Sequence, residues 1–504
     1  MSHGGLRAGS VRVDVREETA VDGRRDTTRI VGPRALAGML IAGVWLGAVA
    51  PAEASNEALL KLMQVLRDRG SITAEEYEAI RKVAEADSAA PDARVAAVEQ
   101  RVTVQEASLA GLKTATEGAV PPLVNKALAG KWYERIGLRG YTQLRYSDVL
   151  AHDGLAVDVP NDRSVNENES FIIRRGRFVF GGNVTERTAL YAQLDFNGST
   201  GAADYSLQMR DLYADISFDK AKNWRVRLGQ QKVPYGFVNL QSSQNRAALE
   251  RPDAINSAVE GERDFGAFLM WAPAEARRRF ADINAQGLKG TGDYGVVALG
   301  AYAGQGPNRA DQNGDVHVVG RVAYPFRLKG GQYVEIGVQG YRGRFVSPVV
   351  TIATGGATFT PTQRVDGVLD QRVAATVVWY PQPFGVEAEW TTGRGPALST
   401  DYRSIDVDSL QGGHVQLNYR QRNTLGTWFP FARWNYFDGA RKFARNAPRT
   451  EVNEVDVGVE FARWAEVEVT GMYTKTIHRT RTSLFPYGRT EDGDRVGFQV
   501  QWNY

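Results

Sequence analysis

Cysteine is absent from the 504-residue sequence, which excludes a disulfide framework, thiolate catalysis and any metal site built on cysteine. Histidine is nearly as scarce, with five residues, at positions 3, 152, 317, 414 and 478. A metal site needs more convergent ligands than these, so we expect no metal and no cofactor. The sequence also lacks a Gly-x-Ser-x-Gly elbow and a Walker loop. We therefore expect no enzyme, with a catalytic site assembled from scattered residues as the alternative.

A strong excess of one charge sign is also missing. The 61 basic and 58 acidic residues leave a formal net charge of +3, and both signs are dispersed along the chain. A nucleic-acid-binding protein would gather its basic residues on one face. We therefore expect no nucleic-acid partner.

Long hydrophobic runs are missing except for one, from Ala35 to Ala50. Four arginines precede this run and the small-residue sequence Ala52-Glu53-Ala54 follows it, which is the pattern of a secretory signal peptide. We expect residues 1–54 to be a signal peptide with an extended leader, cleaved after Ala54. The alternative is a single anchoring helix, but the run is short for a hydrocarbon core about 30 Å thick.

The next segment, residues 55–120, carries apolar residues at helical spacing. Two short helices are predicted over residues 56–82, and Thr73 and Glu76 form a capping box at the start of the second. Farther on, apolar residues recur at intervals of three, four and seven: Val95, Val98, Val102, Leu109 and Leu112. We expect a short coiled coil in the periplasm, with a loosely helical linker as the alternative. Residues 121–135 then serve as a linker.

From about Ile136 to the last residue, the period of the pattern changes to two. Trp224, Val226 and Leu228 alternate with Arg225, Arg227 and Gly229, for example. Such alternation suits a wall with lipid on one side and water on the other. The composition agrees, because a mean hydropathy of -0.35 is combined with 20 Tyr, 20 Phe and 10 Trp. Tyr504 ends the last such segment, and this terminal aromatic resembles the assembly signal of outer-membrane barrels.

About sixteen alternating segments can be counted, starting near residues 137, 171, 187, 209, 223, 263, 293, 314, 332, 370, 385, 412, 428, 452, 465 and 494. Links after even-numbered segments are mostly short and those after odd-numbered segments are long and polar, as in antiparallel membrane barrels. We therefore expect residues 136–504 to form a 16-stranded antiparallel transmembrane β-barrel in the bacterial outer membrane, with the N-terminal segment in the periplasm. A soluble all-β fold is the alternative, but it gives no reason for tryptophans near strand ends.

The alternation also predicts which charges face the lumen. Basic lumen positions gather on the first strands and the last one: Arg139, Arg145, Arg175, Arg177, Arg225, Arg227 and Arg495. Acidic lumen positions come later: Glu387, Glu389, Glu454, Asp456, Glu460, Glu466 and Glu468. Opposed walls would set a transverse field across a wet channel and give each ion a preferred side. The alternative is that these groups bridge one another as wall structure, for which Asp211 and Asp215 are candidate partners.

Four segments resemble the phosphate-selective porin O and P family: Phe171 to Gly182 with its Arg-Arg-x-Arg run, WRVRLGQQKVPYGF from Trp224, Ser242 to Pro252 with its Glu-Arg-Pro, and RDFG from Arg263. The resemblance implies a sixteen-stranded trimeric barrel whose loop after the fifth strand folds into the pore, with arginines along the conduction path. It makes residues 237–262 the inward loop. It makes Arg175, Arg177, Arg225 and Arg227 candidate ladder arginines.

The constriction departs from the family pattern. The phosphate-specific members are similar in clustering lysines there, whereas this chain has only Lys232 near the expected place. The inward loop offers Arg246 and Arg251 beside four acidic residues, Glu250, Asp253, Glu260 and Glu262. A guanidinium tends to hold an anion by a bidentate fork, whereas an ammonium passes it on. Strict phosphate selectivity is therefore not expected.

These patterns predict an outer-membrane porin that lets small hydrophilic solutes diffuse passively and favours anions such as phosphate. Its expected partners are small anionic solutes, outer-membrane lipid and two further copies of the chain in a homotrimer. Two alternatives stay open. The barrel could tether the envelope by contact between its coiled coil and the cell wall, or it could be a barrel enzyme.

Overall fold

The computed structural model describes residues 61, 64–70, 73–79, 81–82, 132–152, 170–197, 205–354, 357–481 and 489–504. The predicted signal peptide, the predicted coiled coil and most of the linker lie outside these residues. Contacts divide the chain into one unit up to Lys126 and a second from Ala127 onward. Each unit is described by itself.

The described part of the first unit contains the predicted capping box. The Thr73 N–H donates to Glu76 Oε2 at 2.9 Å, and the Glu76 N–H donates back to Thr73 Oγ1 at 3.2 Å, in front of a helix over residues 74–79. The two hydrogen bonds satisfy backbone donors that the first helical turn leaves open. Thr73 donates hydrogen bonds to the Glu76 carboxyl, with its N–H making the larger contribution and its hydroxyl the smaller one. These bonds lower the pKa of the carboxyl. The capping box is confirmed.

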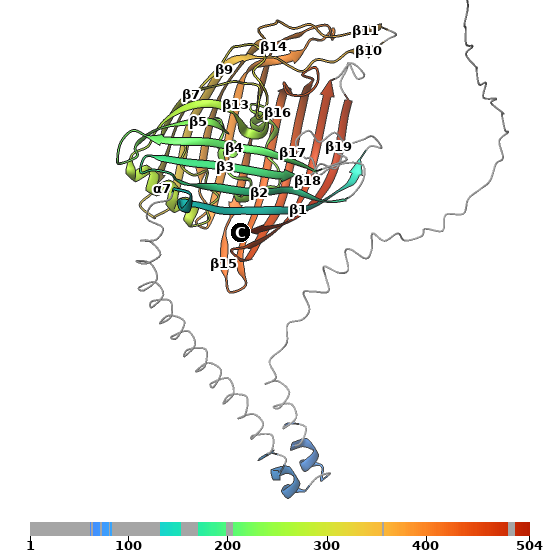
Figure 1. Cartoon of the computed structure of the whole chain (residues 1–504). Helices are drawn as coiled ribbons and strands as arrows, with labels where there is room; N and C mark the ends of the chain where they lie inside the picture. The colour runs from blue at the N-terminus through green and yellow to red at the C-terminus, as the bar shows by residue number, and fades with distance from the viewer. Residues whose placement is uncertain are drawn as a thin grey trace, which may run out of the picture. The chain divides into compact units, whose positions relative to one another are not determined.

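The second unit is a closed antiparallel barrel whose strands follow one another around the wall (Figure 1). Closure is made by β1 and β19, which pair from Tyr141 against Asn503. β14 and β15 both pair with β16 and are two parts of one strand position, so the described residues form a 16-strand barrel, as predicted. The strands are β1 (Ile136–His152), β2 (Ser170–Asn183), β3 (Thr188–Asn197), β4 (Ser206–Ser217), β5 (Trp224–Lys232), β6 (Arg263–Trp271), β7 (Val297–Tyr302), β8 (His317–Arg327), β9 (Tyr333–Phe345), β12 (Val368–Trp379), β13 (Phe384–Leu398), β14 (Ile405–Tyr419), β15 (Gln421–Asn423), β16 (Gly426–Ala440), β17 (Arg449–Trp464), β18 (Val467–Arg481) and β19 (Arg489–Asn503).

Side chains alternate along the strands, so that the outer face of the wall is apolar and the inner face is polar, as a membrane requires. On β12, Asp370 and Arg372 are buried inside the barrel, whereas Val373, Val377 and Trp379 are exposed on the outside. Lipid covers such an apolar outer band, and the polar residues between them face the lumen. Among the described residues, no helix is long and apolar enough to cross a membrane.

The link between β6 and β7 differs from the other links on its side of the barrel. It runs over residues 272–296 and contains α7 (Ala274–Ala285), which begins after Pro273 and ends before Gly287 at φ +66°. Phe280 and Ile283 of α7 are buried. The strand predicted to start near residue 293 therefore begins at Val297. A long helical turn on this side of the barrel was not predicted.

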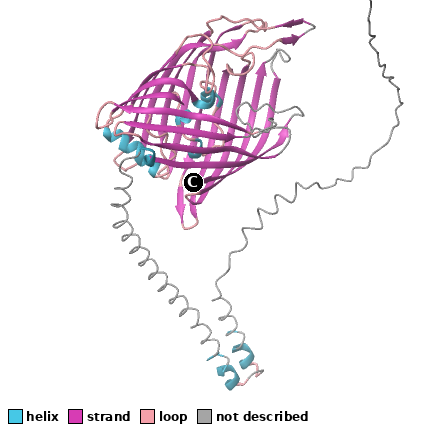
Figure 2. Ribbon diagram, viewed as in Figure 1, coloured by secondary structure: helices cyan, strands magenta, loops and turns pink. Residues whose placement is uncertain are grey.

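The link between β5 and β6 lies inside the barrel, where Figure 2 shows its short helices enclosed by the strands. It contains α5 (Phe237–Leu240), η2 (Ser243–Asn245), α6 (Asp253–Asn256) and η3 (Glu260–Glu262). A further short helix, η1 (Trp132–Arg135), precedes β1, and a hairpin of β10 (Ile352–Thr354) and β11 (Ala357–Phe359) lies in the link between β9 and β12.

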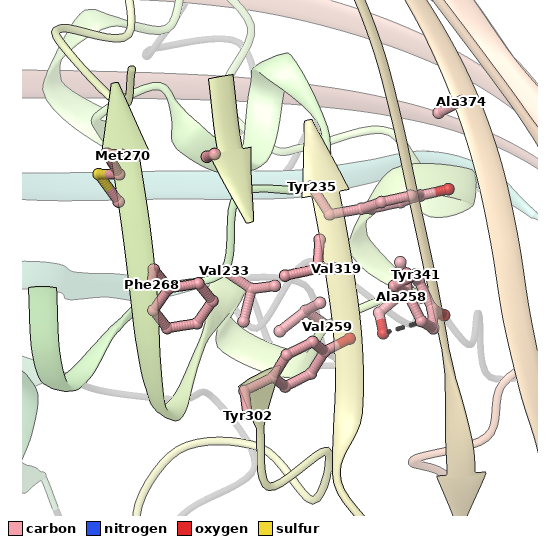
Figure 3. Packing of buried hydrophobic residues seen from close by; sticks show 11 residues of the cluster. Val233, Tyr235, Ala258, Val259, Phe268, Met270, Tyr302, Val319, Tyr341 and Ala374 are labelled. Carbon is pink, nitrogen blue, oxygen red and sulfur yellow. Dashed lines mark hydrogen bonds between the residues drawn. The ribbon is translucent and has the colours of Figure 1, made fainter. Parts of the chain in front are cut away.

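The apolar side of this inward loop packs against one part of the barrel wall. Ala258 and Val259, with Val233 and Tyr235 just before the loop, join a buried cluster with residues of β6, β7, β8, β9 and β12 (Figure 3). Tyr341 of β9 donates its hydroxyl to the Ala258 carbonyl at 3.5 Å. Hydrophobic packing therefore fills the lumen beside β6 to β9, and the charged side of the loop is turned toward the remaining strands.

Candidate pore lining and constriction

The structure places the predicted basic lumen residues inside the barrel. Seven of them are at least nine-tenths buried there: Arg145, Arg175, Arg177, Arg225, Arg227, Lys232 and Arg495. Arg139 is exposed and lines an internal cavity near the start of β1. The buried state of so many cations means that each must meet carboxylates, carbonyls, water or a solute.

Two further arginines enter the lumen because their strands contain β-bulges. Pairing of β1 with β2 skips Arg174, since Gln143 lies opposite Arg175 and Leu144 opposite Ile173. Pairing of β3 with β4 skips Arg210 in the same way. An extra residue in one strand re-aims its side chain, so Arg174 joins Arg175 on the lumen face. Strict alternation would have assigned both bulged residues to the lipid face, which is why sequence reasoning missed them.

Glu250 of the inward loop is held by three arginines of the wall. Its carboxylate accepts from Arg145 at 2.6 Å, from Arg174 at 2.9 Å and from Arg175 at 3.0 Å. On the opposite side, Arg433 of β16 donates to the Glu250 carbonyl at 2.7 Å. Charge-assisted hydrogen bonds to buried guanidinium groups fix geometry strongly. This residue therefore fastens the loop across the lumen.

Glu262, at the end of the inward loop, is the centre of a second cluster. Its carboxylate lies 2.9 Å from Arg251, 3.5 Å from Lys232 and 3.8 Å from Arg246, and it contacts Arg263 as well. Lys232 also donates to two loop carbonyls, at 3.1 Å to Leu240 and 2.7 Å to Gln241. Four cations thus share one carboxylate at this point of the loop.

Arg246 is the least satisfied of these cations. Its side chain is 4% exposed, and none of its three guanidinium nitrogens has a hydrogen-bond partner among the described residues. Its charge also interacts with those of Arg175 and Arg251. A buried donor without a partner is costly, and a guanidinium is costlier still. The site is therefore suited to an acceptor from solution, either water or an anion.

The two arginines of β5 that were predicted to line the conduction path are both paired. Arg227 binds Asp215 through two hydrogen bonds of 2.7 Å, and Arg225 binds Asp293 at 2.8 Å. Asp211 pairs with Arg263 at 2.9 Å instead. For Arg227, the structure thus matches the alternative in which charges bridge one another as wall structure.

The acidic positions of the later strands also have partners. Glu389 accepts from the Phe237 N–H at 2.8 Å and so holds the start of α5, while Glu454 pairs with Arg495 at 2.5 Å and Asp456 with Arg433 at 2.6 Å. Glu387 meets His414 at 2.9 Å, and Glu460 and Glu468 face Lys289 of the α7 link. Glu466 lies in the turn between β17 and β18 and is exposed, so its assignment to the lumen was wrong.

Three cavities, two inside the barrel and one at its short-turn end, each contain more cations than carboxylates. The outer cavity, about 120 Å³, lies near the loop ends of the strands and has five arginines (Arg174, Arg175, Arg177, Arg210, Arg251) against Asp195, Glu260 and Glu262. The inner cavity, about 320 Å³, has Arg139, Arg227, Lys232 and Arg263 against Asp211 and Asp293. The mouth cavity, about 460 Å³, has Lys289, Arg420, Arg422 and Arg463 against Glu460 and Glu468. The excess is two positive charges in each.

The described residues contain no cluster of His, Asp or Glu side chains that could hold a metal ion. Asp253, the remaining predicted residue of the constriction loop, is buried at the start of α6.

This chain was compared with known proteins, and the comparisons found similar solved structures and one matching family. No curated protein is a significant match. Similar solved structures include an outer-membrane channel, DcaP, of Acinetobacter baumannii (14% identity, TM-score 0.44, covering 73% of this chain and 97% of that one). Another is an anion-selective porin of Comamonas acidovorans (11% identity, TM-score 0.40, 73% and 99%). The family model of phosphate-selective porins O and P matches residues 152–503, most of the chain, which therefore belongs to this family of outer-membrane porins.

Proposed function

We propose that this porin passes small hydrophilic solutes along the wall formed by β1 to β5, with a preference for anions. The observation that carries the proposal is the excess of cations over carboxylates in the outer, inner and mouth cavities. Fixed charges in a confined, poorly screened channel raise the local concentration of counter-ions. A solute anion is therefore favoured in these cavities.

The proposed route follows from what fills the rest of the lumen. Apolar residues of the inward loop pack beside β6 to β9, so the water-accessible space is left along the basic wall. The outer and inner cavities lie on this wall, and Glu262, Lys232 and Arg263 separate them. Arg246 stands in the same loop with unused hydrogen-bond donors. Arg246 lies 3.8 Å from Glu262, which lines the outer cavity, so an anion in that cavity would be close to this guanidinium group.

The arrangement favours anions in general over phosphate alone. Lys232 is occupied by two loop carbonyls and Glu262, so the one lysine near the constriction does not offer a free ammonium group. The other cations of the inward loop are guanidinium groups, whose paired N–H donors match both carboxylate and phosphate. Small organic and inorganic anions are therefore the expected solutes.

We propose that the mature protein lacks residues 1–54 and forms a homotrimer. Its helical segment over residues 55–120 would lie in the periplasm. Export requires removal of the signal peptide, and the short turns of a membrane barrel lie on the periplasmic side together with both chain ends. The N-terminus of the mature protein would then be Ser55, which sequencing of the outer-membrane form checks.

Reversal potential in a salt gradient across a planar bilayer tests the proposal. The wild-type channel should favour chloride over potassium at about 0.1 M salt, and Arg246→Gln should bring the permeability ratio closer to one. The effect should fade near 1 M, where the screening length falls to about 3 Å. Arg479→Gln is the matched control, because Arg479 is exposed on the outer face of β18 and should leave the ratio unchanged. A cation-favouring wild-type channel, or no stable channel at all, contradicts the proposal.

A further inference from the structure

The outer wall of the barrel carries a shallow apolar groove across β7, β8, β9 and β12, with a volume of about 560 Å³. Its floor is formed by Gly320 and Gly340, which lie opposite each other on β8 and β9. Leu299 lies opposite Gly320 on one side, and Val373 lies opposite Gly340 on the other. Both apolar side chains are 56% exposed, so the groove opens toward the membrane.

The groove exists because two neighbouring outward positions lack side chains. A Cβ atom at Gly320 would lie 3.4 Å from Leu299 Cδ2, and one at Gly340 would lie 3.4 Å from Val373 Cγ2. These are contact distances, so any larger side chain there would fill the space between Leu299 and Val373. An acyl chain is the apolar body that a membrane offers to a narrow groove of this kind.

Two unpaired arginines lie at the end of the groove nearer the loops. Register places Arg342, Gln371 and Arg394 side by side on β9, β12 and β13, one outward row above Gly340 and Val373. Arg342 lines the groove, and both arginines are exposed. Strands lie about 4.8 Å apart, so the backbones of the two arginines are about 10 Å apart.

The lack of partners distinguishes these two arginines from other outward cations at the same end of the barrel. Neither forms an ion pair or a side-chain hydrogen bond within the described part of the chain. By contrast, Arg344 pairs with Asp366 at 3.2 Å, and Arg449 pairs with Asp438 at 2.8 Å. Arg342 and Arg394 are therefore free to meet an anionic group supplied by the membrane.

The depth of Arg342 and Arg394 along the barrel wall is suited to contact with a lipid headgroup. A cation facing lipid at the bilayer midplane costs about 2–4 kcal/mol, but near the interface the cost falls to about 0–1 kcal/mol. The long links of a membrane barrel mark the external side, so this interface belongs to the outer leaflet. Two guanidinium groups about 10 Å apart complement a headgroup that carries more than one phosphate.

We propose that this groove is a binding site for one molecule of the phosphorylated, multi-acyl lipid of the outer leaflet. One acyl chain lies over Gly320 and Gly340, and the phosphates bind Arg342 and Arg394. The site is on the lipid face, so it is independent of the route that solutes take through the lumen.

Native mass spectrometry of the full-length protein tests this site, with diphosphoryl lipid A as the probe and phosphatidylglycerol as the comparison lipid. The wild-type protein should retain lipid A in preference to phosphatidylglycerol. Arg342→Gln/Arg394→Gln should weaken lipid A retention at least tenfold, and Gly320→Leu should do so with both arginines intact. Arg479→Gln is the control and should retain the wild-type level. Channel conductance should be unchanged in all four proteins.

Three results would overturn the inference: equal retention by the wild-type protein and both groove variants, equal retention of the two lipids, or a cross-link between copies of the chain through cysteines placed at Leu299 and Val373. The last would make the groove a subunit interface. If a variant does not assemble, Gly320→Ala and the single change Arg342→Gln replace the stronger changes. We expect a partial loss of retention from each.

Discussion

Arg227 and Asp215 face each other across β5 and β4 and share two hydrogen bonds of 2.7 Å. A bidentate pair of this kind is electrically neutral as a unit, although each partner alone would act on a passing ion. The Arg227 charge is therefore neutralised by Asp215 in the wild-type channel. Replacement of either residue leaves the charge of the other one uncompensated.

We expect Asp215→Asn to raise the anion preference, because it leaves the Arg227 charge uncompensated in the lumen. Arg227→Gln should lower the preference by exposing Asp215. Reversal potentials at about 0.1 M salt should therefore shift in opposite directions, and both shifts should shrink near 1 M as screening increases. Two shifts of the same sign, or none in a folded protein, would mean that ions do not pass this part of the wall.

Glu250→Gln should loosen the inward loop. The carboxylate is shared by Arg145, Arg174 and Arg175, and removal of one partner from a buried charged cluster costs about 3–5 kcal/mol. We expect a lower unfolding temperature and a larger, noisier single-channel conductance. Asp366→Asn is a matched control, since Asp366 pairs with Arg344 at an exposed site. A quiet channel of wild-type conductance would contradict the role of Glu250 in fastening the loop.

Removal of residues 1–130 should leave conduction intact. The barrel strands close on themselves through β1 and β19, and β1 begins only at Ile136. A chain that starts at Lys131, refolded in detergent, should form channels with the conductance of the full-length protein. Failure to form channels would show that the N-terminal segment takes part in barrel folding or in the pore.

Deletion of Tyr504 should lower the yield of assembled barrel more than it alters conductance. Its N–H donates to the Gly140 carbonyl at 3.0 Å, its carbonyl accepts from Gly140 at 2.7 Å, and its hydroxyl donates to the Arg177 carbonyl at 3.2 Å. The last residue thus completes the seam between the last and first strands. Heat-modified migration in gels measures the yield, and Tyr504→Phe should assemble better than the deletion because it keeps the backbone bonds.

The strands and the family could be predicted from sequence because a membrane wall imposes one rule at nearly every position. Alternation marks each strand wherever one face meets lipid, and the observed β8 and β12 follow it closely. The rule fails where a strand contains an extra residue. Arg174 and Arg210 were therefore missed, since a bulge shows only in the pairing with the neighbouring strand.

Contacts between distant parts of the chain could not be predicted from the sequence pattern either. The lack of hydrogen-bond partners at Arg246 depends on how the inward loop sits among wall residues, which no local pattern reports. No helix was predicted between the segments starting near residues 263 and 293. The helix α7 was missed because Phe280 and Ile283 are too few apolar residues to make a clear helical pattern. Glu466 was misplaced because β18 begins only at Val467, so the alternation that carries Glu468 does not extend back to it.

The fastening of Glu250 has a consequence for the order of biogenesis. Its side chain is held by strands at the beginning of the barrel, but its carbonyl is held by Arg433, 183 residues later in the chain. The loop reaches its final position only when strands from both parts of the chain have come together, because its contacts lie on β1, β2 and β16. Until then, Glu250 and its arginines face water in an open sheet, so dehydration of this cluster accompanies closure of the barrel.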